Sequence, residues 1–116
     1  MKRDYRDYLE DILAAIDETA EFTSGISFEE FTRDRKTINA VVRSLEVLGE
    51  AAKGIPADVR AEAPGVPWKY MAGMRDKLIR EYFGVDLSMV WTVIKSELPP
   101  VRSAIEFLLA KLEKAK

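Results

Sequence analysis

Apolar residues recur at helical spacing over almost the whole chain. In the first stretch they return every three or four residues, which places them on one face of a helix with 3.6 residues per turn. These positions are Tyr5, Tyr8, Leu9, Ile12, Leu13, Ile16 and Ala20. No stretch shows the alternation of β-branched and polar residues between hairpin turns that is typical of strands. The periodicity therefore predicts an all-α fold.

Glycines, prolines and capping residues divide the chain into helices. Gly25 suits the end of the first helix, and Ser27 with Glu30 has the form of a capping box for a short second helix. Asp86 is expected to cap a later helix. The Pro99-Pro100 pair is expected to kink or split the chain, because proline lacks an N–H. We expect further helices over residues 35–53, 68–82, 87–96 and 101–112, with one or two turns in 57–63.

No repeat or linker divides the 116 residues, so a single domain over residues 1–116 is expected. Its predicted architecture is an antiparallel helical bundle of four to five main helices. The last helix carries an apolar stripe that suits packing against another helix. That helix belongs either to this chain or to a second copy, and because a small bundle has a limited core we expect a homodimer. The stripe consists of Val101, Ile105, Leu108, Leu109 and Leu112.

The chain contains neither cysteine nor histidine, which excludes several kinds of site. There is no disulfide, no thiol nucleophile, no Ser-His-Asp triad and no histidine-based metal site or acid–base group. Carboxylates alone can bind Mg²⁺, but the sequence has no acidic cluster of that type, so no metal and no cofactor is predicted. Catalysis would have to use carboxylates, Lys, Arg, Tyr or Ser.

The net charge of −2 is unevenly distributed. Residues 1–32 hold three basic and nine acidic side chains, a balance of −6, and residues 33–116 hold fifteen and eleven, a balance of +4. The basic excess permits an anionic partner, although a solvated mixed surface gives the same pattern. No apolar run is long enough for a membrane helix and no secretory signal is evident, so no membrane association and a cytoplasmic location are expected.

Residues 74–86 are the most distinctive segment. Arg75 and Tyr82 are seven steps of about 100° apart, so they return to almost the same helix face, whereas Arg80 lies about 140° around from Arg75. Structural interpretations are simple: Asp76 and Arg80 form an i, i+4 ion pair, Arg75 pairs with Glu46 or Glu50, and Tyr82 packs in the core. Other side chains that we expect to pack in the core are Trp68, Met71, Met74 and Trp91.

A set of short phrases, spread over about residues 5–112, resembles the HepT-like ribonuclease toxins, a branch of the HEPN superfamily. The phrases are Asp7-Tyr8-Leu9-Glu10-Asp11-Ile12, Phe28-Glu29-Glu30-Phe31, Asp34-Arg35-Lys36-Thr37, Leu48-Gly49-Glu50-Ala51-Ala52-Lys53, Pro67-Trp68, Gly73-Met74-Arg75 and Tyr82-Phe83-Gly84-Val85-Asp86-Leu87. The resemblance implies an α-helical dimer that is partnered by a minimal nucleotidyltransferase antitoxin and acts on RNA without a metal. It also implies an Arg-Asn-x-x-x-His-x-Tyr motif, in which Arg and His cleave RNA and Tyr accepts AMP from the antitoxin.

The chain matches this motif at Arg75 and Tyr82 and departs from it at Asp76 and Arg80. The resemblance thus implies catalytic roles for positions 75, 76 and 80, and an AMP-acceptor role for Tyr82. A guanidinium group stays protonated at neutral pH and is a poor base, and pairing with Arg80 would weaken Asp76 as a substitute. We therefore expect weakened or lost RNA cleavage.

Two other functions remain open from the sequence. The chain could be a non-catalytic partner and AMP acceptor of the nucleotidyltransferase, or a nucleotide-binding interaction module. It could also be a plain structural dimer with solvated basic clusters, in which case RNA binding with a marked salt dependence would be absent.

Overall fold

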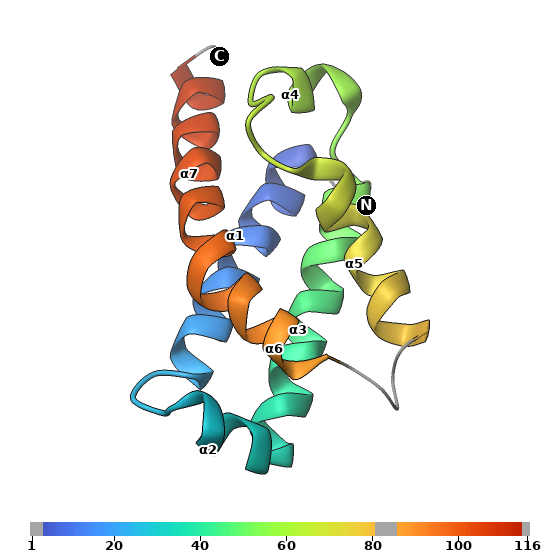
Figure 1. Ribbon diagram of the computed structural model, residues 1–116. Helices are drawn as coiled ribbons and strands as arrows, with labels where there is room; N and C mark the ends of the chain where they lie inside the picture. Colours follow the sequence, from blue (N-terminus) through green and yellow to red (C-terminus); the bar gives the residue numbers. More distant parts are fainter. Residues whose placement is uncertain (1–3, 81–85, 115–116) are drawn as a thin grey trace.

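The computed structural model describes residues 4–80 and 86–114 as an antiparallel helical bundle in which these residues form no strand. The long helices run alternately down and up the bundle (Figure 1). They are α1 (Tyr5–Phe22), α3 (Arg35–Lys53), α5 (Trp68–Arg80) and α7 (Leu98–Lys114). The short ones are α2 (Phe28–Arg33), α4 (Ala57–Ala61) and α6 (Leu87–Thr92). The predicted all-α bundle is confirmed.

The helix ends follow from local sequence chemistry. Gly25 adopts a φ of 76° after α1, a backbone conformation that glycine tolerates without strain. Ser27 and Glu30 form the predicted capping box: the Ser27 hydroxyl accepts from the Glu30 N–H at 3.1 Å, and the Glu30 carboxylate accepts from the Ser27 N–H at 3.0 Å. Asp86 caps α6 through the N–H groups of Ser88 and Met89.

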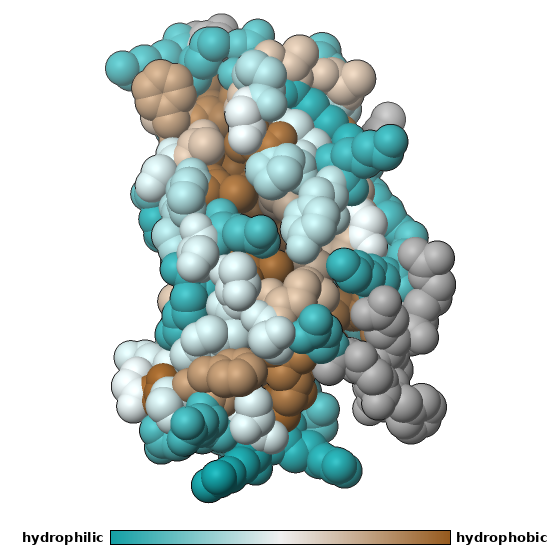
Figure 2. Space-filling view, viewed as in Figure 1, coloured by the Kyte–Doolittle hydropathy of each residue, from teal (hydrophilic) through white to brown (hydrophobic). Residues whose placement is uncertain are grey.

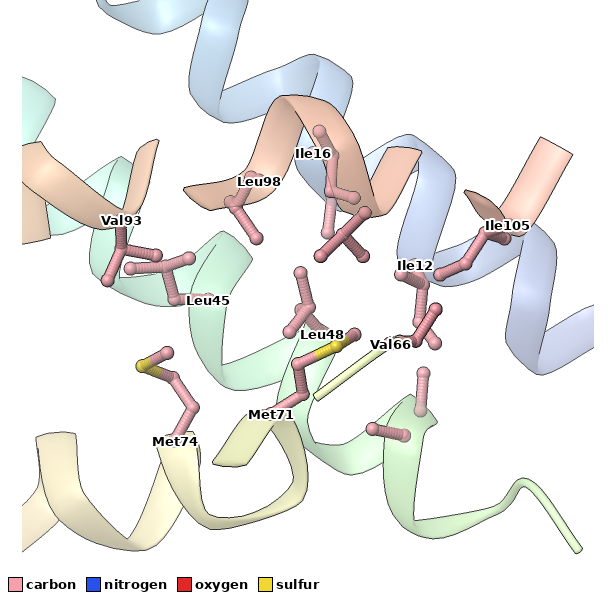
Figure 3. Close-up of a cluster of buried hydrophobic side chains, with 14 of the residues drawn as sticks. Ile12, Ile16, Leu45, Leu48, Val66, Met71, Met74, Val93, Leu98 and Ile105 are labelled. Atoms are coloured by element: carbon pink, nitrogen blue, oxygen red, sulfur yellow. The ribbon is translucent and has the colours of Figure 1, made fainter. Parts of the chain in front are cut away.

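The core lies between the four long helices (Figure 3). Helix α3 packs against α1 and α5, while α7 packs against α1. Three residues of the C-terminal stripe, Val101, Ile105 and Leu108, are buried within this one chain. Of the two explanations for the stripe, intramolecular packing accounts for these three positions. Figure 3 shows the contributions of the four long helices, which include Ile12, Ile16, Leu45, Leu48, Met71, Met74, Leu98 and Ile105.

The Pro99-Pro100 pair does not split the chain. It lies in the first turn of α7, directly after a π-helical segment, Val93–Glu97, that continues from α6. A wider π-helical turn before the prolines accommodates rings that would otherwise clash with the carbonyl groups four residues earlier. Figure 1 shows that the helical run changes direction here, as expected for a kink.

The predicted core aromatic and methionine side chains are largely confirmed. Trp68, Met71 and Met74 are buried. Trp91 is half-buried and packs against Phe28 and Phe31, with ring centroids 5.8 and 5.2 Å away. In the described part of the chain, no helix combines the length and the apolar character needed to cross a bilayer. On the face shown in Figure 2, hydrophilic side chains cover much of the surface, with apolar side chains visible between them.

Candidate functional site

Arg75 lies at the joint between α3 and α5. The buried stripe of α5 consists of Trp68, Met71, Met74 and Leu78, and Arg75 lies beside this stripe rather than in it. Its side chain is 41% exposed, so the guanidinium group reaches the rim of the joint and is accessible to a ligand.

Gly49 allows the two helices to meet closely at Arg75. A Cβ atom on Gly49 would lie 3.0 Å from the backbone nitrogen of Arg75 and 3.1 Å from the carbonyl oxygen of Met71. Both atoms belong to the α5 backbone, which cannot rotate away as a flexible side chain would. Because residue 49 is glycine, the α5 backbone at Arg75 can lie directly against α3.

Four charged residues alternate across this joint. The Nε atom of Arg75 is 3.3 Å from the Glu50 carboxylate, and the Lys53 ammonium group is 3.5 Å from Glu50 and 3.6 Å from Asp76. The predicted structural pairing of Arg75 with Glu50 is confirmed. Exposed ion pairs of this kind contribute about 0–1 kcal/mol, so their main effect is to orient the side chains.

Arg75 opens onto a cleft of about 400 Å³ between α1, α3 and α5. Tyr8 forms part of its wall and packs tightly on Gly54, where a Cβ atom would lie only 2.7 Å from two ring carbons. The lining residues are Tyr8, Asp11, Arg43, Glu46, Val47, Glu50, Ala51, Gly54 and Arg75. The cleft thus combines an aromatic ring with two guanidinium groups and three carboxylates.

The structure tests the predicted site residues only in part. Arg75 lines the cleft, and Asp76 lies next to it on the exposed side of α5, within reach of Lys53. Arg80 ends α5, but its side chain lies outside the described part of the chain, as does Tyr82. The catalytic roles proposed for Arg75, Asp76 and Arg80, and the modification of Tyr82, therefore stay predictions.

Sequence reasoning did not assign Tyr8, Asp11, Arg43 and Glu46 to a site. One signal was available for α3, because Arg43, Glu46 and Glu50 follow an i, i+3, i+7 spacing that puts three charges on one helix face. In residues 4–80 and 86–114, no group of three or more acidic side chains is arranged as metal ligands.

Comparison with known proteins adds a family assignment. The HepT-like family model, described as ribonuclease HepT-like, matches residues 12–108. A Thermococcus cleftensis protein named "Probable ribonuclease HepT" is 50% identical over 93% of this chain and 98% of its own length. A relative from Methanocaldococcus jannaschii, whose name includes RNase, is 46% identical over 97% of each chain. No solved structure matches the chain. On this similarity, the protein belongs to the HepT-like ribonuclease family.

Proposed function

We propose that this protein is the ribonuclease-type toxin of a toxin–antitoxin pair and that the Arg75 cleft binds the RNA backbone. The observation that carries the proposal is the half-exposed Arg75 guanidinium group, held at an open cleft by Gly49 and Glu50. Guanidinium groups bind phosphate through paired N–H donors. The RNase-named relatives that match over nearly their whole length support the same substrate class.

The proposed chemistry is metal-independent cleavage through the ribose 2′-hydroxyl. The 2′-oxygen forms a new bond to phosphorus and loses its proton, while the bond to the 5′-oxygen breaks and that oxygen takes up a proton. Arg75 would bind the phosphate oxygens and stabilise their growing negative charge. Family members with the full motif have His at the position of Arg80, and imidazole exchanges protons near neutral pH. Arg80 can hold phosphate but cannot act as a base, so cleavage is weakened or lost.

The proposed assembly is a homodimer with a nucleotidyltransferase partner. The outer side of α5 is exposed at Lys69, Tyr70 and Gly73, and no heavy atom lies within 4 Å of a Cβ atom built on Gly73. A second copy facing this side would place two α5 helices next to each other across a two-fold axis. Arg75 is two residues, or about 200°, from Gly73, so each Arg75 still opens onto the cleft of its own chain. AMP attached to Tyr82 would add bulk and negative charge to the protein and so disfavour RNA binding.

The test is a comparison of RNA cleavage by the unaltered chain, Arg80→His and Arg80→Lys. We expect Arg80→His to gain cleavage by about 10²–10⁴-fold, the usual contribution of general acid–base catalysis. Arg80→Lys keeps the positive charge without a group that titrates near neutral pH, so it should stay as inactive as the unaltered chain. An Arg80→His protein that folds and binds RNA but cleaves none would show that the role given to position 80 is wrong.

A second candidate function is favoured by the complete absence of histidine. The chain would serve as a non-catalytic AMP acceptor for the nucleotidyltransferase. Mass spectrometry after incubation with that enzyme and ATP would then show one added AMP, located at Tyr82 and absent from Tyr82→Phe. AMP addition without RNA cleavage, even by the Arg80→His protein, would favour this function over the first.

A further inference from the structure

Two oppositely charged side chains that line the cleft form no ion pair with each other. Arg43 and Glu46 lie one helical turn apart on α3, and both line the cleft. Within the described part of the chain, neither has an ion-pair or hydrogen-bond partner. By contrast, Glu50 already contacts Arg75 and Lys53. The cleft thus keeps one cation and one carboxylate available for a ligand.

The charged side chains of α3 that line the cleft lie in a row along one face of the helix. Arg43, Glu46 and Glu50 share one helix face, and Arg43 and Glu50 are about 10 Å apart along the helix axis at 1.5 Å per residue. Arg75 contacts Glu50 from the neighbouring helix. The available carboxylate of Glu46 therefore lies between two guanidinium groups, one at each end of the cleft.

This pattern suits a nucleotide better than a simple anion. Carboxylates from Asp11, Glu46 and Glu50 would repel inorganic phosphate, whereas a nucleotide presents N–H donors as well as phosphate. The volume of about 400 Å³ lies within the range of small-ligand sites. Tyr8, held against Gly54, supplies a rigid aromatic wall beside the ligand.

A carboxylate at the position of Glu46 would also discriminate between bases. Guanine presents its N1–H and N2–H donors side by side, so that one carboxylate can accept both. Uracil presents a single N–H between two carbonyl oxygens, which the same carboxylate repels. Bidentate contacts of this kind give base discrimination of about 1–3 kcal/mol, or roughly tenfold or more in affinity.

We propose that this cleft is a guanine-nucleotide subsite in which Glu46 accepts the base N–H groups and Arg43 binds the phosphate of that nucleotide, while Arg75 at the other end binds the adjoining phosphate of an RNA strand. The ligand is either a guanosine of an RNA strand or a free guanine mononucleotide. In its RNA form, the inference rests on the proposed ribonuclease function and specifies which nucleotide the substrate places beside Arg75.

The test is calorimetric titration of the full chain with GMP, UMP and inorganic phosphate. We expect GMP to bind about tenfold more tightly than UMP, and phosphate to bind most weakly. Glu46→Gln should remove the difference between GMP and UMP, and Arg43→Ala should weaken both by about tenfold. Arg35→Ala is the matched control, because Arg35 is an exposed arginine of the same helix that does not line the cleft.

Equal binding of GMP and UMP, or a preference that survives in Glu46→Gln, would overturn the inference. Circular dichroism of each variant excludes unfolding as the cause, and neither replaced side chain has a partner to lose in the described structure. Two RNA oligomers that differ only by G-to-U replacement distinguish the sources of the ligand: a preference shared by oligomers and mononucleotides indicates an RNA guanosine, and one confined to mononucleotides indicates a free nucleotide. Salt-sensitive RNA binding with no preference for guanine, in oligomers or mononucleotides, would contradict the guanine subsite but not the proposed function. The absence of any RNA binding would contradict both.

Discussion

Arg75 is held at a helix joint without being buried there. Its backbone is fixed by the close approach of Gly49, and its guanidinium group is oriented by Glu50. Burial of an unpaired guanidinium group would cost several kcal/mol, whereas an exposed and paired one costs little and stays available. The sequence places on α5 a residue that can bind phosphate, and the neighbouring helix determines where it points.

Replacing Glu50 by glutamine should strengthen RNA binding. In the proposed site the carboxylate would compete with phosphate for Arg75, and the neutral amide has the same shape but attracts the guanidinium group less. We expect the affinity for a short RNA to rise a few-fold, with thermal stability changed by no more than about 1 kcal/mol, as for an exposed ion pair. Fluorescence anisotropy measures the affinity. Weaker RNA binding by a normally folded Glu50→Gln protein would show that Glu50 supports the ligand site rather than competing with it.

Only part of the candidate site could be predicted from the sequence. The pairing of Arg75 with Glu50 was expected from neighbouring helix faces, and the structure confirms it. Tyr8, Arg43 and Glu46 were not assigned, because Tyr8 belongs to α1 and its approach to α3 depends on tertiary packing over Gly54. Helical periodicity defines the face of each helix, but it does not determine which faces enclose a cleft.

Among the helices, the contact between α3 and α5 is the one that most directly determines the site. Gly49→Ala would introduce a Cβ atom 3.0 Å from the α5 backbone, so the two helices would have to separate. We expect a loss of about 1–3 kcal/mol in the free energy of unfolding, as for other overpacked sites. Gly73→Ala is the matched control, because nothing lies within 4 Å of its Cβ position and alanine favours a helix by roughly 0.5–1 kcal/mol. Chemical denaturation measures both, and equal effects would contradict the close contact.

Helix capping makes the stability of the fold sensitive to acid. Hydrogen bonds from Thr37 hold the pKa of Asp34 below its ordinary value of 3.8, and the Ser88 hydroxyl does the same for Asp86. The Arg102 guanidinium group likewise lowers the pKa of Asp17, which ties α1 to α7. Because the folded pKa values lie below the unfolded ones, the unfolded chain binds more protons as the solution becomes acidic.

The free energy of unfolding should therefore be constant from about pH 7 to 5 and fall as the pH drops below about 4, through the folded pKa values. Urea denaturation at several pH values measures this. Asp34→Asn should be less stable at neutral pH and show a smaller loss on acidification. A stability that rises on acidification would contradict the assigned capping bonds.

Sequence and structure agree most closely at the helix ends and least at the segment that leads into the last helix, α7. Gly25, Ser27 and Asp86 act through local hydrogen bonds or backbone conformation, so neighbouring residues suffice to predict them. The π-helical segment before Pro99 was not predicted, since it depends on keeping Leu98 and Val101 buried while accommodating two proline rings.

The proposed dimer needs an exposed surface on which two copies can meet. The buried part of the α7 stripe packs within one chain, but Phe107 of the same helix is 74% exposed. On the outer side of α5, Tyr70 is 43% exposed and Gly73 is exposed as well. Light scattering coupled to size exclusion should give twice the monomer mass. Replacing Gly73 by a bulky charged residue such as glutamate should shift the protein toward monomer if α5 forms the interface. A monomeric unaltered chain would contradict the proposed homodimer.

The salt dependence of RNA binding shows whether the Arg75 cleft binds RNA phosphate, because each phosphate contact releases counterions. Affinity for one short RNA would be measured over a series of salt concentrations for the unaltered chain, Arg75→Ala and Arg35→Ala. We predict that Arg75→Ala binds more weakly and that the slope of log affinity against log salt falls by about one, the loss of a single phosphate contact. Arg35→Ala should leave the slope unchanged. An Arg75→Ala protein with the affinity and slope of the unaltered chain would show that Arg75 does not bind RNA phosphate.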